Sequence, residues 1–258
     1  MRLDVAGAGP AYTDRLGASG AAYLLRHAGT SLLLDFGQGS FPRLAGLMEP
    51  ADLDGIVVSH LHPDHFIDLV ALRHYLRFER DMARVRVVGP PGLDERLDAL
   101  HGQPGFTAGA LDVEVLHEGT FRVGAFDITA GRVTHTESSF GFRVVPTAAS
   151  SGGDAGHTGP ALVYSGDCAR SSDLDPLIEP GDVLLCEVSF GTGPVPPGAQ
   201  HLDGPEVGAF ARRVGAGRVL LTHLQMGFDR AATVASVRAG YDGPVELVEP
   251  GFYTTIGA

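Results

Sequence analysis

The sequence predicts a layered α/β fold from the order and the apolar pattern of its segments. Short β-rich runs separated by Gly-rich turns open the chain at residues 3–6, 22–26 and 31–35, as in an antiparallel hairpin arrangement. Two later segments, residues 56–76 and 203–221, each join a continuous apolar strand to a capped or Pro-started helix. Strand clusters interleaved with helices indicate sheets that are covered by helical layers.

The individual elements follow from apolar spacing. Pro63 is expected to open a helix directly after the strand at residues 56–59, and its apolar positions lie near helical spacing at Phe66, Leu69, Val70 and Leu76. The second helix begins at a capping-box-like sequence, Asp203-Gly204-Pro205-Glu206. Further strands are expected at residues 85–88, 126–133, 140–145, 162–164, 183–186 and 219–221.

Two loops stand out in the remaining sequence. Residues 146–160 are rich in small side chains and are expected to form a long loop, and residues 191–200 a mobile one beside His201. Neither a dividing linker nor a short-period repeat is visible. We therefore expect a single domain over residues 1–258.

Composition narrows the class of protein. With 44% hydrophobic and 19% charged residues, the chain has the balance of a globular protein and not of a disordered or fibrous one. No apolar run approaches the ~18 residues of a membrane span, and the first residues start no signal-peptide pattern. Only Cys168 and Cys186 could form a disulfide. A soluble, cytoplasmic protein with reduced thiols is the expectation.

The charge balance disfavours a nucleic-acid partner. All 19 basic residues are Arg, and 31 acidic residues bring the formal net charge to −12. A protein that relies on many phosphate contacts normally presents a basic face, and no basic run is visible. A folded surface could still gather basic side chains around one helix and the strand after it, namely Arg73, Arg77, Arg80, Arg84 and Arg86.

The histidines carry the most information about function. The run His60-Leu61-His62-Pro63-Asp64-His65 follows directly on the strand at residues 56–59. By chance this pattern would arise only ~0.0015 times in a chain of this length and composition. Imidazoles at alternate positions leave a strand end on one side, and the helix turn that follows returns Asp64 and His65 to the same spot. Such nitrogen and oxygen ligands suit zinc, and also manganese or iron.

This segment resembles the metal-binding signature of the metallo-β-lactamase superfamily, and the rest of the signature can be found in order along the chain. His135 matches the third metal-site histidine at a strand end, and Asp167 matches the bridging aspartate in the turn Ser165-Gly166-Asp167. His223 matches the last histidine, after an apolar strand. Taken singly, each of these three could be structural or solvated. The complete set, each member just beyond an expected strand, argues for a metal site.

The resemblance implies a fold, a cofactor and a set of ligands. The fold is the four-layer αβ/βα sandwich, spanning essentially the whole chain. Two divalent metal ions, first of all Zn²⁺ with Mn²⁺ or Fe as alternatives, would be held by seven residues: His60, His62 and His135 at one ion, Asp64, His65 and His223 at the other, and Asp167 between them. Asp35 resembles the superfamily's early aspartate, which supports the ligand turn from behind. A plain turn aspartate is the alternative for Asp35.

Two further residues point to one branch of the superfamily. Glu187 and His201 resemble the glutamate and histidine pair of the ribonuclease Z and cyclic-nucleotide phosphodiesterase branch, and with Asp64 they are the candidate catalytic residues. In that branch two metal ions activate a hydroxide and bind phosphate oxygens, while a positioned imidazolium protonates the departing alkoxide. A surface-loop histidine and a solvated glutamate at a strand end are the alternatives.

The substrate expectation is a small phosphodiester, most of all a 3′,5′-cyclic nucleotide cleaved to the 5′-monophosphate. Ribonuclease Z usually carries a flexible arm between the third histidine and the bridging aspartate, whereas only 167 − 135 = 32 positions separate His135 from Asp167 here. Residues 137–141 and 201–204 also resemble the bacterial cyclic-nucleotide phosphodiesterases. Three alternatives stay open: a ribonuclease Z-like RNA phosphodiesterase, a lactone, thioester or β-lactam hydrolase, and a non-catalytic metal-binding protein. Relatives commonly pair, so a homodimer is a further expectation.

Overall fold

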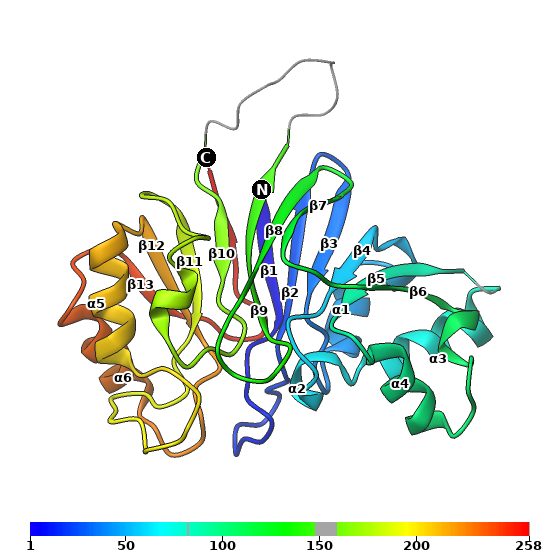
Figure 1. Ribbon diagram of the computed structural model, residues 1–258, viewed down its shortest axis with the longest axis horizontal. Helices are drawn as coiled ribbons and strands as arrows, with labels where there is room; N and C mark the ends of the chain where they lie inside the picture. Colours follow the sequence, from blue (N-terminus) through cyan, green and yellow to red (C-terminus); the bar gives the residue numbers. More distant parts are fainter. Residues whose placement is uncertain (82, 148–158, 258) are drawn as a thin grey trace.

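A computed structural model describes residues 1–81, 83–147 and 159–257, and within them the chain forms two seven-stranded sheets (Figure 1). The first sheet has the order β14-β1-β2-β3-β4-β5-β6 and consists of β1 (Arg2–Gly7), β2 (Ala22–His27), β3 (Thr30–Leu34), β4 (Gly55–Val57), β5 (Val85–Gly89), β6 (Leu111–Val115) and β14 (Tyr253–Thr255). The second has the order β13-β12-β11-β10-β9-β8-β7 and consists of β7 (Gly119–Val123), β8 (Phe126–Arg132), β9 (Phe140–Pro146), β10 (Leu162–Tyr164), β11 (Val183–Glu187), β12 (Arg218–Thr222) and β13 (Val245–Leu247).

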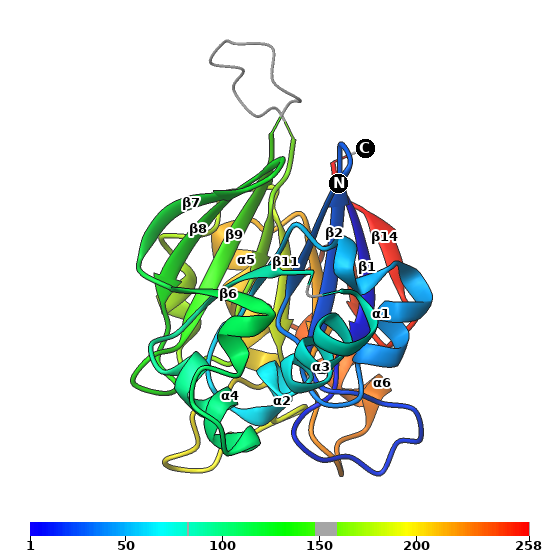
Figure 2. The ribbon, with the colours of Figure 1, turned by 90° about the vertical axis from the view of Figure 1, so that its right-hand side faces the viewer.

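Helices cover the outer face of each sheet. Those of the first sheet are α1 (Phe41–Leu47), α2 (Pro63–Phe66), α3 (Leu69–Glu79) and α4 (Leu93–His101), and those of the second are α5 (Gly204–Val214) and α6 (Arg230–Arg238). Figures 1 and 2 show α3 and α4 on the side of β6, while α5 and α6 lie on the side of β13. Three short 3₁₀ turns complete the set at Pro50–Asp52, Thr107–Gly109 and Ser171–Leu174. The expected four-layer αβ/βα sandwich is confirmed.

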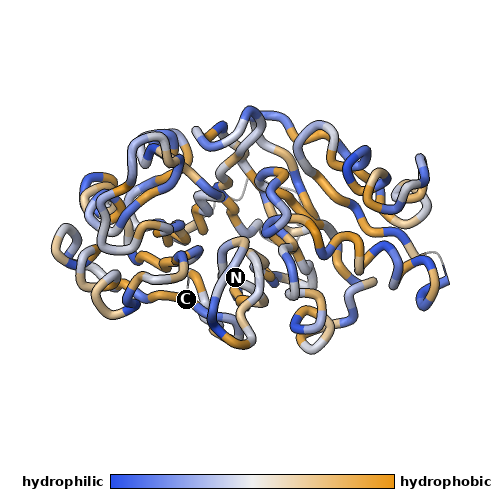
Figure 3. The backbone as a smooth tube through the Cα atoms, turned by 90° about the horizontal axis from the view of Figure 1, so that it is seen from below, coloured by the Kyte–Doolittle hydropathy of each residue, from blue (hydrophilic) through white to orange (hydrophobic). Residues whose placement is uncertain are grey.

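Alternating side chains build the layers. In β3, Leu32 and Leu34 point into the core between the two sheets, whereas Leu33 packs against the helices of the first sheet. In β11, Leu185 points into the same central core and Leu184 packs towards α5 and α6. Successive residues of a strand face opposite sides of its sheet, so strands buried on both faces read as unbroken apolar runs. Figure 3 shows hydrophobic stretches of the chain running through the interior and many hydrophilic turns at the periphery.

Most of the predicted elements are present, with two differences. The helix expected to run on from Pro63 is two helices, because the amide of Asp68 donates to the carbonyl of Phe36 (3.0 Å) and α2 therefore ends at Phe66. The capping box at Asp203 is half formed. Its carboxylate accepts from the amide of Glu206 (3.0 Å), but the Glu206 side chain accepts from the amide of Ser171 and does not return to Asp203.

The loop expected at residues 146–160 lies largely outside the described residues, which resume at position 159. Within the described part of the chain, no helix combines the length and apolar character needed to cross a bilayer. Cys168 and Cys186 are both buried and free, as expected for reduced thiols.

Candidate metal centre

One edge of the two sheets gathers the predicted ligands, because several strands end there. β3 and β4 of the first sheet run parallel to each other, as do β10, β11 and β12 of the second, and they finish at the same edge. Each carries a polar side chain of the predicted set at its last residue or within three residues beyond it: Asp35, His60, Asp167, Glu187 and His223. Strand ends of this kind are where α/β sheets place their sites. The turn after His62 continues into α2, which carries Asp64 and His65.

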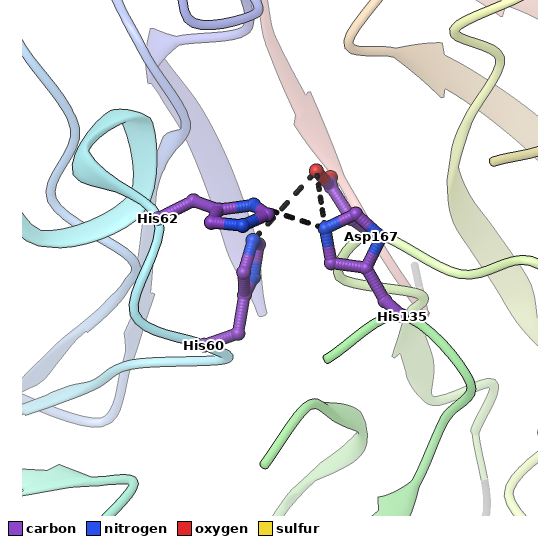
Figure 4. A group of neighbouring side chains, drawn as sticks. All are labelled: His60, His62, His135 and Asp167. Atoms are coloured by element: carbon purple, nitrogen blue, oxygen red, sulfur yellow. Dashed lines mark hydrogen bonds and ion pairs between the residues drawn. The ribbon is translucent and has the colours of Figure 1, made fainter. Parts of the chain in front are cut away.

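The first cluster consists of His60, His62, His135 and Asp167, whose ligand atoms all lie within 4.8 Å of one another. Figure 4 shows His60 and His62 on one loop facing His135 and Asp167 on two others. The Asp167 carboxylate lies 3.8 Å from Nε2 of His60 and 3.7 Å from Nε2 of His135. His60 and Asp167 are buried while His62 is exposed, so the cluster is closed on the protein side and open towards solvent.

The second cluster consists of Asp64, His65, Asp167 and His223, all of them buried. Nε2 of His223 lies 3.0 Å from the Asp64 carboxylate and 3.5 Å from that of Asp167, and Nε2 of His65 lies 3.4 Å from Asp167. Asp167 therefore belongs to both clusters. The seven residues that the resemblance implies as ligands all lie in these two clusters.

Unpartnered atoms in the clusters fit metal ions. Three buried side-chain atoms of the clusters have no hydrogen-bond partner among the described residues: Nε2 of His60, Nε2 of His65 and Oδ1 of Asp167. A buried polar atom left without a partner costs about 1–3 kcal/mol. Three such atoms converge on one spot, and imidazole nitrogen with carboxylate oxygen is a ligand set that zinc, manganese and iron accept. The clusters are consistent with a binuclear metal site.

The charges within the clusters are strongly coupled. Burial alone would raise the pKa of Asp167, but the imidazoles of His223, His65 and His60 hold it well below its ordinary value. Burial and the neighbouring His65 lower the pKa of His60 well below its ordinary value. The Asp167 carboxylate is thus a negative centre among imidazoles, which is the environment that favours a bound cation.

Asp35 lies behind the ligand turn, fully buried, with a left-handed backbone (φ 57°). Its carboxylate accepts from the amide (2.6 Å) and hydroxyl (2.7 Å) of Ser59, from Nδ1 of His65 (2.7 Å) and from the hydroxyl of Tyr164 (2.6 Å). A proton held on Nδ1 of His65 leaves its Nε2 free to face the cluster. The geometry is that of the supporting aspartate, and not of a plain turn residue.

Sequence reasoning missed two of these supporting groups. Ser59 directly precedes the first histidine of the motif, which is a local signal that could have been followed. Tyr164 sits at the end of β10, and nothing in its local sequence indicates that it reaches Asp35 across the interface between the sheets.

Glu187 and His201 form a third group beside the clusters. Oε1 of Glu187, which is fully buried, accepts from Nδ1 of His201 (2.9 Å) and from the amide of Cys168 (2.7 Å), the residue after Asp167. His201 is partly buried, and its Nδ1 lies 3.9 Å from the Asp167 carboxylate. Burial alone would lower the pKa of His201, but the hydrogen bond and charge of Glu187 raise it to about 9. His201 is therefore an imidazolium at neutral pH.

The loop at residues 191–200, predicted to be mobile, is tied to the site at its end. The carbonyl of Gln200 accepts from Nδ1 of His135 (2.8 Å), which leaves Nε2 of His135 towards the first cluster. The loop thereby brings His201 next to His135, with ring centroids 4.8 Å apart.

Comparison with known proteins agrees with this geometry. Residues 28–224 match the profile of the Beta-lactamase superfamily domain, a stretch that holds every predicted ligand. The chain belongs to the metallo-β-lactamase superfamily. The superfamily match and the two clusters together make it a metal-dependent hydrolase.

Three relatives place the chain within the superfamily. An uncharacterized protein of Mycobacterium tuberculosis is 33% identical over 239 residues, covering 88% of this chain and 82% of the relative. The probable metallo-hydrolase YhfI of Bacillus subtilis is 24% identical over 247 residues (90% and 91%), and its crystal structure superposes with a TM-score of 0.83 over 98% of both chains. Ribonuclease Z of Mycobacterium marinum is 27% identical over 226 residues, 80% of each chain. The chain thus lies in the branch of the superfamily that includes YhfI and ribonuclease Z.

Proposed function

We propose that the protein hydrolyses a small phosphodiester, first of all a 3′,5′-cyclic nucleotide, to the 5′-monophosphate. The single observation that carries the proposal is the pairing of Glu187 with His201 at the edge of the metal clusters. Metal ligands alone serve many reactions on this fold, so the substrate class has to be argued from the groups around them. Similarity to ribonuclease Z, named for cleavage of RNA, adds support for phosphodiester chemistry.

The ligands would hold two metal ions, for which we propose zinc. His60, His62 and His135 would bind one ion, Asp64, His65 and His223 the other, and Asp167 would contact both. Such a pair supplies a water molecule that is acidic enough to act as nucleophile at neutral pH and a clamp for phosphate oxygens. Asp64, one of the candidate catalytic residues, would act in this proposal as a ligand of the second ion.

His201 would donate the proton that the leaving oxygen needs. With a pKa of about 9, its imidazole carries two protons at neutral pH. Nδ1–H is directed to Glu187, so the proton on Nε2 is the one available for transfer. Expelling an unprotonated ribose alkoxide is unfavourable, and a positioned acid contributes typically 10²–10⁴-fold to such a step. Opening a lactone or a β-lactam would place the same demands on the metals and also expels a basic oxygen or nitrogen, so turnover has to separate these substrate classes.

Of the five arginines that could have formed an RNA-binding face, four are held by polar partners, and Arg77 lies over the ring of Phe106. Arg73 is buried, and its guanidinium donates to the carbonyl of Leu97 and the hydroxyl of Thr107. Three others on the same face each form an ion pair with a carboxylate of a neighbouring segment: Arg80 with Glu49, Arg84 with Asp112 and Arg86 with Glu114. Neutralised in this way, they favour a small substrate over a polyanion.

The test compares 3′,5′-cyclic AMP, bis(p-nitrophenyl) phosphate and a lactone on one preparation whose metal content is determined. Cleavage of both phosphodiesters with about two metals per chain would support the proposal. Lactone turnover with no phosphodiester cleavage would overturn it in favour of carbonyl chemistry. No turnover of any of the three by the fully loaded protein would overturn it in favour of a metal-binding role.

A further inference from the structure

Ser189 lies between Glu187 and His223, and sequence reasoning did not single it out. Its side chain is fully buried. The hydroxyl oxygen is 2.5 Å from Oε2 of Glu187, 3.0 Å from Nδ1 of His223 and 3.2 Å from Nδ1 of His201. It thereby spans the gap between the partner of His201 and a ligand of the second metal cluster.

The direction of these hydrogen bonds follows from counting protons. A serine hydroxyl has one proton to donate, and a carboxylate can only accept. The short contact with Glu187 therefore uses the Ser189 proton. Towards His223 the Ser189 oxygen can only accept, so Nδ1 of His223 must carry a proton. Nε2 of His223 then faces Asp64 and Asp167 from the other side of the ring, at 3.0 and 3.5 Å.

Backbone contacts hold the two partners at this spacing. The carbonyl of Ser189 accepts from the amide of Gln225 (3.2 Å), two residues beyond His223. His223 itself has a left-handed backbone (φ 58°), and its amide donates to the carbonyl of Ala8 (2.9 Å) in the loop between β1 and β2. A left-handed conformation in a non-glycine residue persists only where its surroundings fix it. Because the backbone is fixed at both Ser189 and His223, the Ser189 hydroxyl reaches the His223 imidazole without movement of either segment.

We propose that Ser189 is a positioning residue that sets the tautomer and orientation of His223 for metal binding, with Glu187 as its anchor. The Glu187 carboxylate then serves two histidines: it receives Nδ1–H of His201 directly and supports Nδ1–H of His223 through Ser189. One buried carboxylate thus links the proposed proton donor to the metal centre. The inference concerns the metal site and does not depend on which substrate the site cleaves.

Metal affinity tests this inference without reference to activity. We would compare wild-type protein, Ser189→Ala and Ser189→Thr by competition for zinc against a chromogenic chelator, with circular dichroism to check the fold. Partners that orient a metal-bound histidine typically contribute 10–100-fold to affinity. Ser189→Ala should weaken binding of one of the two ions by about 10-fold or more, whereas Ser189→Thr, which keeps the hydroxyl, should retain most of the affinity. Ser236→Ala removes a half-buried hydroxyl that donates to the carbonyl of Thr233 within α6, and should leave both affinities unchanged.

Two results would overturn the proposal. One is an unchanged affinity for both ions in folded Ser189→Ala. The other is an equal loss of affinity for both ions in folded Ser189→Ala, since His223 is proposed to bind only one of them. Either result leaves the phosphodiesterase proposal standing, because that proposal is tested by turnover.

Discussion

Nδ1 of His201 lies 2.9 Å from the carboxylate of Glu187, and this contact joins the loop before α5 to the end of β11. Burial would favour a neutral imidazole, yet the carboxylate raises the pKa of His201 to about 9. Glu187 also accepts the amide that follows Asp167, so the same side chain fixes the turn carrying the shared metal ligand. The proposed proton donor and the cluster of candidate metal ligands are therefore held in one hydrogen-bonded unit.

Replacing His201 separates catalysis from metal binding. His201→Ala should keep two bound metals, because its imidazole is not among the seven proposed ligands, but should lower kcat on a cyclic nucleotide by ~100-fold or more. Turnover and metal content measured on the same sample check both parts. His101→Ala, at the exposed end of α4, is the matched control and should behave as wild type. A His201→Ala rate equal to that of wild type would contradict the role of His201 as acid.

Removing the charge of Glu187 should change the pH profile. His201 can donate a proton only while it is protonated, so with a pKa of about 9 its contribution is present below that pH and is lost as the pH rises through it. In Glu187→Gln the supporting charge is gone and the pKa of His201 falls, so the alkaline limb of kcat against pH should move to lower pH. An alkaline limb that stays in place would show that another group controls it.

Asp167 is the ligand that both clusters share, so its loss should affect both metals. Asp167→Asn keeps the side-chain volume but removes the charge that balances three neighbouring imidazoles. We expect fewer than two metals per chain after dialysis and almost no hydrolysis. Metal analysis by mass spectrometry checks this. Retention of two tightly bound ions in folded Asp167→Asn would contradict the placement of Asp167 between them.

Asp35 should contribute to stability as well as to the metal site. Asp35→Asn tolerates the left-handed backbone but disturbs a buried carboxylate with four donors, so the metal-free protein should lose about 2 kcal/mol of unfolding free energy. Urea unfolding measures this. Tyr164→Phe removes one of the four donors and should cost about 1 kcal/mol. An Asp35→Asn protein as stable as wild type would argue against the network.

The positions of the site residues could be predicted because two signals coincide in the sequence. Asp35, His60, Asp167, Glu187 and His223 follow continuous apolar runs, and such runs form strands buried on both faces whose ends meet at one edge. The three histidines at positions 60–65, after the fourth strand, then indicate a metal site. The strands of the core were predicted for the same reason, since burial on both faces leaves an unbroken apolar run.

Elements without such a run were missed. β7, β13 and β14 are short strands at or near the sheet edges, where polar side chains break the apolar pattern. α4 and α6 are short helices with few buried side chains, so their helical spacing is weak, although Gly102 after α4 and Asp229 before α6 are recognisable caps.

Supporting groups such as Tyr164 and Ser189 depend on tertiary contacts. Tyr164 reaches a residue 129 positions away along the chain, and Ser189 one 34 positions away. The residues next to Tyr164 and Ser189 in the sequence do not indicate these distant contacts.

The most direct test of the central claim is a zinc titration of metal-free protein while 5′-AMP formation from 3′,5′-cyclic AMP is followed. We predict that hydrolysis appears as zinc binds and saturates near two equivalents per chain, and that His201→Ala reaches the same loading but turns over ~100-fold more slowly. Fully loaded wild-type protein that forms no 5′-AMP would contradict this prediction.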